Sequence, residues 1–271
     1  MVVLATKVYV EGDARERSLD SLRSLVNNQL GDLDVTVEIG VRHDDFPSVT
    51  VEGEDAVVAR NVLRAEWGEI VPDLEPGETY VGTLERWDDD GFVLDAGQAV
   101  RIPTEGLGLG PGSPAQIRER FGLVQHLPLE FVYEEGSNGA ESGAEAEDEP
   151  GVEFDNESAS EAEDESGVAA GSDTDGQRAS NRHPGGTRLS DDERDRLFEW
   201  TRGSGRLNVN SSTRGEVRAT LNRAGHAQDY VTVERLGLLE QSVICKPETD
   251  PPGLLASVGS YLRAELRCVV P

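Results

Sequence analysis

The chain has 271 residues, and its 53 acidic side chains against 25 basic ones give a formal net charge of −28. This length is enough for two or three small domains. Two cysteines are too few for a disulfide framework or a cysteine-based metal site. No stretch approaches the roughly 18 apolar residues that a membrane-spanning helix needs, and the first residues lack a signal-peptide pattern. We therefore expect a soluble, cytoplasmic protein with no membrane partner.

Residues 1–72 are predicted to form a ferredoxin-like α/β domain. Strands are indicated by alternating apolar residues, and helices by apolar residues at helical spacing. The predicted elements, in the order β-α-β-β-α, are residues 7–10, 16–30, 34–41, 48–51 and 55–67. This order is most of a ferredoxin-like unit, in which two helices cover one face of an antiparallel sheet.

Residues 73–134 are predicted to form a small curled sheet or barrel, because short β segments alternate there with glycine and aspartate turns. Trp87 to Gly91 is predicted to form a hairpin loop in which Gly91 is free to take a positive φ. The elements expected after this hairpin are a strand at 98–103, a short helix at 115–121 and a closing strand at 127–133.

Residues 135–187 differ in kind from the rest of the chain. Positions 134–177 hold 16 acidic residues and no lysine or arginine. Such a segment buries too little apolar surface to offset the entropy lost on ordering, so we predict a disordered acidic linker. A second interpretation is a tail that competes with nucleic acid for a basic surface.

Residues 188–271 are predicted to form a second ferredoxin-like α+β domain. Two capping boxes open helices at Ser190 and Thr213, each with a glutamate three residues later. A third helix follows the Thr249–Gly253 turn and is expected to run through Leu262. The expected strands are residues 206–210, 230–234, 239–246 and 266–270.

The central β module resembles an S1-like OB-fold barrel, a class that binds single-stranded RNA. The residues that carry the resemblance are Gly77, Tyr80, Gly82, Gly91, Phe92, Val93, Asp95 and Gly97. The resemblance implies stacking of bases on exposed aromatic side chains over a basic strand face. It therefore suggests Phe92 and Tyr80 as stacking platforms, with Arg86 and Arg101 as phosphate contacts.

The whole layout also resembles an uncharacterised archaeal domain-of-unknown-function family with N-terminal, central and C-terminal parts. The segments that carry this resemblance are Val57–Asn61 with Trp67-Gly68, the Gly77–Gly97 pattern, Arg223–His226 with Asp229, and Cys245-Lys246 with Thr249–Gly253. The resemblance implies an archaeal cytoplasmic protein and suggests no activity.

The composition resembles that of proteins from a salt-saturated cytoplasm, as in haloarchaea. Only Lys7 and Lys246 are lysines, whereas aspartate and glutamate occur throughout the chain. In molar salt the Debye length falls to about 3 Å, so repulsion between carboxylates is largely screened. The acidic composition therefore does not by itself exclude a nucleic-acid partner.

The turn from Thr249 to Gly253 is the best candidate site for a small ligand. A helix N-terminus offers free backbone N–H groups and a partial positive charge, and Lys246 and Arg223 would complete an anion pocket. The Asp250-Pro-Pro-Gly253 run also resembles the helix-opening turn of ACT-type amino-acid-sensing domains. The alternative is that Thr249 or Asp250 is simply the N-cap of the helix.

Other residue patterns favour structural interpretations. The four histidines are scattered without metal-ligand spacing, so neither a zinc site nor a cofactor is expected. His226 and Asp229 are spaced so that they could form a pair, but we favour the interpretation that His226 is a surface histidine at a helix end. Asp88 to Asp90 lack the loop of a calcium site and are interpreted as an acidic turn. No catalytic constellation is recognisable, so we expect no enzyme.

The first hypothesis is a non-enzymatic protein that binds RNA or a ribonucleoprotein through the central module. The alternatives are a small-ligand sensor that uses the Thr249–Gly253 turn and a scaffold that binds another protein.

Overall fold

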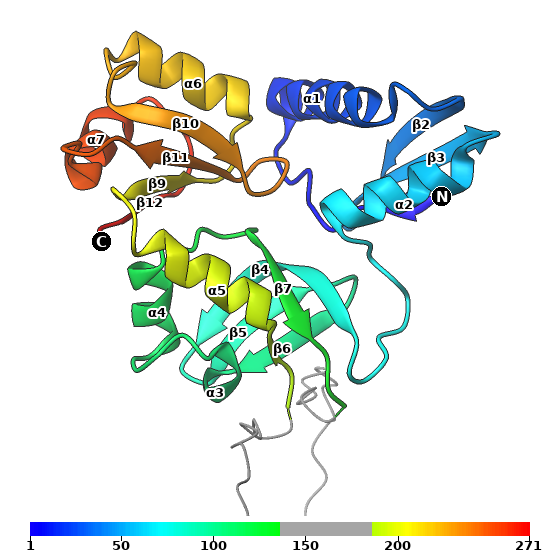
Figure 1. Ribbon diagram of the computed structural model, residues 1–271, viewed down its shortest axis with the longest axis horizontal. Coiled ribbons are helices and arrows are strands. Elements are labelled where there is room, and N and C mark those ends of the chain that lie inside the picture. The colour runs from blue at the N-terminus through cyan, green and yellow to red at the C-terminus, as the bar shows by residue number, and fades with distance from the viewer. Residues whose placement is uncertain (136–185) are drawn as a thin grey trace, which may run out of the picture. The chain divides into compact units, whose positions relative to one another are not determined.

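The computed structural model describes residues 1–135 and 186–271. Within these residues the chain is a mixed α+β protein with three antiparallel sheets, which confirms the predicted class (Figure 1). Apart from its ends, the predicted linker lies outside the described residues. None of the helices in the described ranges is long and apolar enough to cross a membrane.

The first sheet has the strand order β1-β3-β2 and is antiparallel. Its elements are β1 (Val2–Val3), α1 (Gly12–Leu30), β2 (Val35–Val41), β3 (Pro47–Gly53) and α2 (Ala56–Trp67). The apolar stripe predicted for the first helix is confirmed, since Leu22, Val26 and Leu30 are buried. These side chains share one core with Leu63 of α2 and with the strands.

The strand predicted for residues 7–10 is wrong. The place beside β3 is taken by β1, whose Val2 and Val3 pair with Val49 and Ser48. Residues 7–10 are an extended connection. The alternation has another cause. Val8 is fully buried, whereas Lys7 and Tyr9 form hydrogen bonds with side chains from the parts of the chain that hold the other two sheets.

The central sheet has the strand order β6-β5-β4-β7-β8. Its strands are β4 (Thr79–Asp88), β5 (Gly91–Asp95), β6 (Ala99–Pro103), β7 (Pro128–Val132) and β8 (Arg188–Leu189). The short helix α3 (Thr104–Leu107) packs against β8 and brings the two edge strands of the sheet close together. The sheet is therefore curled, as predicted.

The hairpin between β4 and β5 depends on Gly91. Its φ is +150°, and a Cβ atom there would lie 2.0 Å from the carbonyl oxygen of Ile102 on β6. A side chain at this position would collide with the neighbouring strand. The hairpin predicted for Trp87 to Gly91 is present, but its loop is shorter than predicted, because strand pairing continues through Trp87–Phe92 to the Asp88–Gly91 pair.

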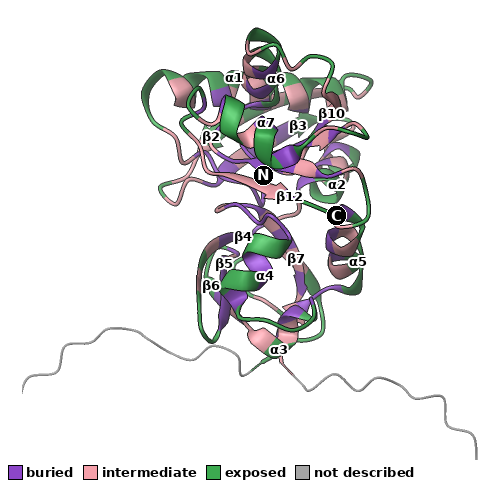
Figure 2. Ribbon diagram, turned by 90° about the vertical axis from the view of Figure 1, so that its left-hand side faces the viewer, coloured by how far each residue is buried: buried purple, intermediate pink, exposed green. Residues whose placement is uncertain are grey.

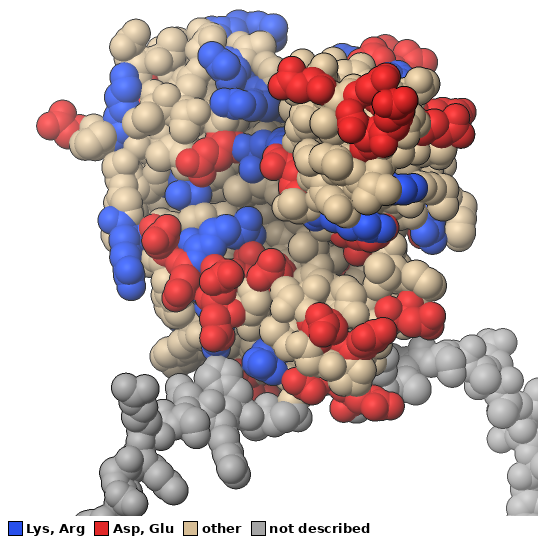
Figure 3. Space-filling model, turned by 45° about the vertical axis from the view of Figure 1, so that its right-hand side comes forward, with Lys and Arg blue, Asp and Glu red and all other residues tan. Residues whose placement is uncertain are grey.

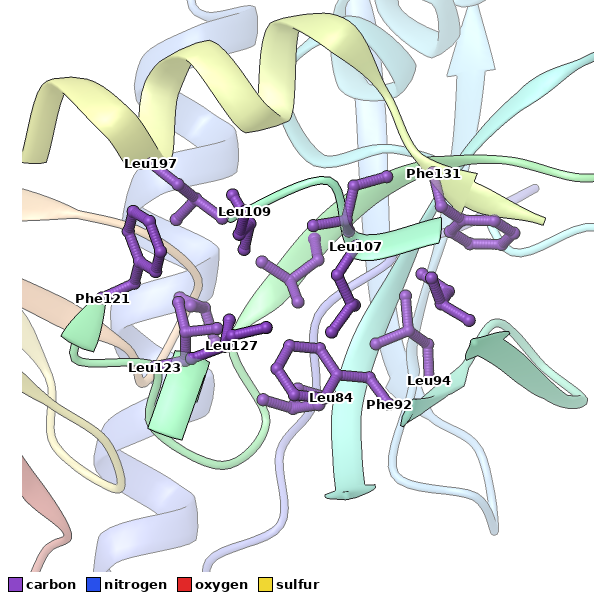
Figure 4. Packing of buried hydrophobic residues seen from close by; sticks show 14 of the residues in the cluster. Leu84, Phe92, Leu94, Leu107, Leu109, Phe121, Leu123, Leu127, Phe131 and Leu197 are labelled. Carbon is purple, nitrogen blue, oxygen red and sulfur yellow. The ribbon is translucent and has the colours of Figure 1, made fainter. Parts of the chain in front are cut away.

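Apolar side chains fill the curled sheet (Figure 4). The core takes residues from β4 and β5, from α3, and from α4 (Pro114–Arg120). It also takes Leu189 from β8 and Leu197 and Trp200 from α5 (Asp191–Trp200), although the sequence analysis grouped these residues with the last domain. The segment after the linker thus returns to the central module before the chain continues.

The third sheet has the strand order β10-β11-β9-β12 and is antiparallel. Its elements are β9 (Arg206–Val209), α6 (Arg214–Arg223), β10 (Tyr230–Arg235), β11 (Gln241–Cys245), α7 (Pro251–Val258) and β12 (Leu266–Val269). Its core is a separate cluster that includes Leu207, Val243 and Leu254. Figure 2 shows that exposed residues lie along one side of the helices and buried residues lie toward the strands.

Helix ends agree in part with the capping signals. The predicted box at Thr213 is complete, because its hydroxyl accepts from the N–H of Glu216 and the Glu216 carboxylate accepts from the N–H of Thr213. At Ser190 the hydroxyl accepts from the N–H of Glu193, whereas the Glu193 carboxylate bonds Arg196 instead. Helix α7 ends at Val258 and not at Leu262, because Gly259 forms its C-cap.

Candidate functional site

Phe92 cannot serve as an exposed stacking platform. Its side chain is fully buried and lies inside the central core (Figure 4). The predicted stacking role required the Phe92 side chain to point to the solvent-exposed face of β5. All of Gly91 to Leu94 are buried, so this short strand offers no exposed aromatic face.

The other three residues predicted for the barrel face, Tyr80, Arg86 and Arg101, lie in different surroundings. Tyr80 is half-buried, packs against Phe131 at 6.1 Å between ring centroids, and accepts a hydrogen bond from the N–H of Glu75. Arg86 is exposed. Arg101 donates two hydrogen bonds to Asp88, of 2.7 and 2.8 Å. These bonds hold the pKa of Asp88 at about 2, so much of the charge of Arg101 is already matched.

Tyr80 lines a cavity of about 730 Å³, whereas Arg86, Phe92 and Arg101 do not. The walls of this cavity come from α2, β4, β7, α5 and the loop after β10. Its charged lining residues are Arg64, Glu66, Glu69, Glu130, Glu193, Arg196 and Arg235. It therefore lies where parts of all three sheets approach each other.

A second cavity of about 520 Å³ adjoins the first and shares Arg196, Arg235 and Leu236 with it. Its charged lining residues are Arg196, Glu199, Arg206, Arg214, Glu234 and Arg235. Four arginines and two glutamates give it a formal charge of +2, in a chain whose net charge is −28. We call the two cavities together the arginine groove. Figure 3 shows basic side chains gathered around a hollow in one face, with acidic ones beside them.

Two tryptophans hold the guanidinium groups of the arginine groove in place. Arg206 and Arg196 lie 4.9 and 5.5 Å from the ring of Trp200, and Arg235 lies 4.0 Å from the ring of Trp67. Burial lowers the pKa of Arg206 and of Arg235, but arginine starts so high that both stay charged at neutral pH. The groove therefore presents flat, pre-positioned cations.

Two guanidinium donors in the groove lack an acceptor among the described residues. These buried atoms are Nε of Arg196 and Nη1 of Arg235. Other nitrogens of the same side chains bond Glu193 and Glu66. A buried donor without an acceptor costs about 1–3 kcal/mol, and no group among the described residues offsets that cost at these two atoms.

A polar cluster joins the three sheets behind this groove. Lys7 donates to Glu85 at 2.8 Å and to Asp95 at 2.7 Å, and His126 contacts the same Glu85 oxygen at 3.2 Å. Burial alone would raise the pKa of Glu85, but His126 and Lys7 outweigh it and lower the pKa to about 2. For Lys7, burial would lower the pKa, and the two carboxylates raise it instead. We call these residues, with Tyr9 and Glu240, the polar junction.

Glu240 is the most unusual group of the polar junction. It is fully buried, and its Oε1 accepts a hydrogen bond of 2.7 Å from the hydroxyl of Tyr9. Its Oε2 has no hydrogen-bond partner in the described part of the chain. Burial raises the pKa of Glu240 to about 8, so it carries a proton at neutral pH. The Tyr9 ring also stacks on His126, which has a φ of +65°.

The Thr249–Gly253 turn is occupied by its own residues. The Asp250 carboxylate accepts from the N–H of Gly253 at 3.0 Å, which makes Asp250 the N-cap of α7. Thr249 donates its hydroxyl proton to the carbonyl oxygen of Asp229, and the N–H of Lys246 donates to the same oxygen. Arg223 is exposed at the last position of α6. The capping interpretation therefore explains this turn without a ligand.

His226 does pair with Asp229, although the sequence favoured a surface histidine at a helix end. Nδ1 of His226 lies 2.6 Å from Oδ2 of Asp229, and Nε2 lies 2.6 Å from Oγ of Ser257. The serine was not singled out from the sequence, since it lies 31 residues further along the chain. Among the described residues, no group of three or more histidine, cysteine, aspartate or glutamate side chains is arranged to hold a metal ion.

Sequence models of one family match most of the chain in three consecutive pieces. The DUF2110 N-terminal domain matches residues 1–73, the DUF2110 central domain matches residues 74–149, and the DUF2110 C-terminal domain matches residues 204–270. No curated protein and no solved structure matches the chain.

Proposed function

The chain belongs to the DUF2110 family, and we propose that it binds single-stranded RNA, alone or within a ribonucleoprotein, through the arginine groove. The observation that carries the proposal is the second cavity of the groove, whose formal charge is +2 in a chain of charge −28; the two cavities together hold five arginines and six glutamates. We propose binding, and no chemical step, for the groove.

The shape of the cations favours a nucleic acid over a compact anion. Arg206 and Arg235 lie over tryptophan rings, and guanidinium planes can stack on unpaired bases as well as contact phosphates. The half-buried ring of Tyr80 lies in the adjoining cavity.

The topology of the central sheet supports an S1-like OB-fold. Numbered within the sheet, the order β6-β5-β4-β7-β8 reads 3-2-1-4-5. This is the order of a five-stranded OB barrel, a fold that carries oligonucleotide-binding surfaces. The groove residues Arg196 and Trp200 lie on α5, which packs on this module.

The outer sheets support ferredoxin-like units. Counted within its own sheet, the order β12-β9-β11-β10 reads 4-1-3-2. The first sheet reads 1-3-2, and an antiparallel bridge from Leu4 to Glu69 occupies the place of the fourth strand. Both sheets therefore fit the split β-α-β arrangement.

We propose a halophilic archaeal origin and a cytoplasmic location on composition alone, because lysine is nearly absent and carboxylates are abundant. This origin sets the conditions for a test. Phosphate contacts weaken as salt rises, with a slope of about −0.7 per contact for single strands. Base stacking persists, so binding must be measured across a potassium chloride series.

Arg214 provides the cleanest test of the groove. It is exposed at the start of α6 and lines the second cavity, whereas Arg218, one helical turn further, is exposed and lines neither cavity. Fluorescence anisotropy with a labelled single-stranded RNA would compare Arg214→Gln with Arg218→Gln. We expect roughly tenfold weaker binding, about 1.4 kcal/mol, for Arg214→Gln alone.

A second pair of variants separates the groove from the barrel face. Arg86→Gln with Arg101→Gln changes the face that the sequence analysis favoured and leaves both cavities intact. We expect wild-type binding from this double variant. Equal losses for Arg214→Gln and Arg218→Gln, or a large loss only for the barrel-face variant, would contradict the assignment to the groove.

A further inference from the structure

The side chains of Asp229, His226 and Ser257 form a continuous hydrogen-bonded relay on the C-terminal sheet unit. The two contacts of the His226 ring, to Oδ2 of Asp229 and to Oγ of Ser257, are both 2.6 Å. Neither Ser257 nor its partners line the arginine groove. This relay is therefore separate from the proposed RNA site.

The direction of proton donation in the relay follows from the carboxylate. A carboxylate oxygen only accepts hydrogen bonds, so the tautomer that fits the contact with Asp229 has Nδ1 of His226 as the donor. In that tautomer Nε2 has a free lone pair, which accepts the proton of the Ser257 hydroxyl. The arrangement is that of a nucleophile, a general base and a group that orients the base.

Backbone contacts hold all three side chains in place. The N–H of His226 donates to the carbonyl oxygen of Leu221 after Gly225, whose φ is +89°. The carbonyl oxygen of Asp229 accepts from Lys246 and from Thr249. The relay is thus built on the end of α6, a fixed loop and α7.

Ser257 differs from other serines in helices of this chain. Ser18 and Ser24 in α1 donate their hydroxyl protons to carbonyl oxygens four residues earlier. The hydroxyl of Ser257 meets the ring of His226 instead. Ser257 is also exposed, so a reagent in solution reaches its oxygen.

We propose that Ser257 is an activated nucleophile that takes an acyl group from an activated ester. Its oxygen attacks the ester carbonyl carbon while its proton passes to Nε2 of His226. The bond from carbon to the leaving oxygen breaks, and the proton on Nε2 passes to that oxygen, or to water when the leaving group departs as a phenolate; the product is an acyl ester on Ser257. Water then attacks the acyl carbon while Nε2 takes one of its protons, the bond from carbon to Oγ breaks, and Oγ takes the proton from Nε2, which releases the acid and regenerates the serine.

The class of acyl donor follows from the location of the serine. Ser257 lies inside α7, whose amide groups are used in the helix. Such a site gives little stabilisation to a developing oxyanion. The inference is therefore limited to esters with good leaving groups, and it does not extend to amides.

The test uses the full chain and p-nitrophenyl acetate. Release of p-nitrophenolate gives the rate of acylation, intact-mass spectrometry counts the acetyl groups bound, and peptide mapping locates them. We expect one acetyl group on Ser257, and no modification of this peptide in Ser257→Ala. Ser260→Ala is the matched control, because Ser260 is exposed just beyond the end of α7, and it should react like the wild type.

Variants of the other two residues test the relay itself. His226→Gln should slow acylation of Ser257 by roughly 10²- to 10⁴-fold, which is the usual contribution of a general base. The wild-type rate should rise with pH as one group loses its proton and then level off, whereas the rate in His226→Gln should follow hydroxide without levelling. Circular dichroism would show that the variants remain folded. Equal labelling of Ser257 and Ser260, or labelling of Ser257 that His226→Gln leaves unchanged, would overturn the proposal.

Discussion

Replacing Glu240 with glutamine should stabilise the protein at alkaline pH and change little in mild acid. In the folded chain the pKa of Glu240 is about 8, and its ordinary value is 4.5. Below pH 4.5 the group is protonated in both the folded and the unfolded state, so it contributes no pH dependence. Between pH 4.5 and 8 the unfolded state releases the proton and the folded state keeps it, so the wild type loses stability as pH rises.

The size of the effect follows from this difference. One pH unit corresponds to about 1.4 kcal/mol, so the cost of Glu240 is about 2 kcal/mol at pH 6 and reaches on the order of 5 kcal/mol above pH 8. Glutamine keeps an oxygen that accepts from the Tyr9 hydroxyl and carries no charge at any of these pH values. Its amide replaces a protonated carboxyl of nearly the same shape.

Urea denaturation at fixed potassium chloride, repeated at pH 5, 7 and 9, measures the difference. We expect the free energy of unfolding of Glu240→Gln to exceed that of the wild type by an amount that grows with pH. A constant difference across the three pH values would refute the reasoning, because it would show that the carboxyl of Glu240 titrates alike in the folded and unfolded states.

Two further substitutions test other parts of the structure. Glu85→Gln should lower the free energy of unfolding, which is the opposite of the effect expected for Glu240→Gln. The pKa of Glu85 is lowered to about 2, so this carboxylate adds stability above pH 4.5 that is lost toward pH 2. The variant should lose about 3 kcal/mol at pH 7 in the same urea assay, whereas a loss that persists unchanged at pH 2 would show that ionisation is not the cause. Gly91→Ala should disrupt the central sheet, because its Cβ atom would lie 2.0 Å from the carbonyl oxygen of Ile102; we expect a drop in melting temperature measured by calorimetry, and a wild-type value would mean that the hairpin tolerates a side chain.

Local patterns in the sequence predicted local structure well. The capping box at Thr213, the buried stripe of α1 and the hairpin at Gly91 each depend on residues within a few positions of one another. The strand expected at residues 7–10 failed for a different reason. Alternation indicates that one side is buried, and it does not tell whether the neighbour is a strand or, as here, the polar junction.

The candidate sites required knowledge of the tertiary structure. The glycine and aromatic pattern around Phe92 indicated a strand, but Gly91 to Leu94 are all buried, so the exposed aromatic role was assigned to a core residue. The four arginines of the second cavity come from α5, β9, α6 and β10, and they form no basic run in the sequence. Ser257 likewise meets His226 only because α7 packs beside the end of α6.

Crosslinking of RNA to the intact protein in a lysate of its own cells, at molar potassium chloride, would test the central claim most directly. We predict that RNA co-purifies and that the crosslinked peptides contain the groove residues Arg196, Trp200, Arg206, Arg214 or Arg235. Crosslinks confined to the barrel face around Arg86 and Arg101 would contradict the assignment to the arginine groove. Recovery of a stoichiometric protein partner without RNA would contradict RNA binding itself.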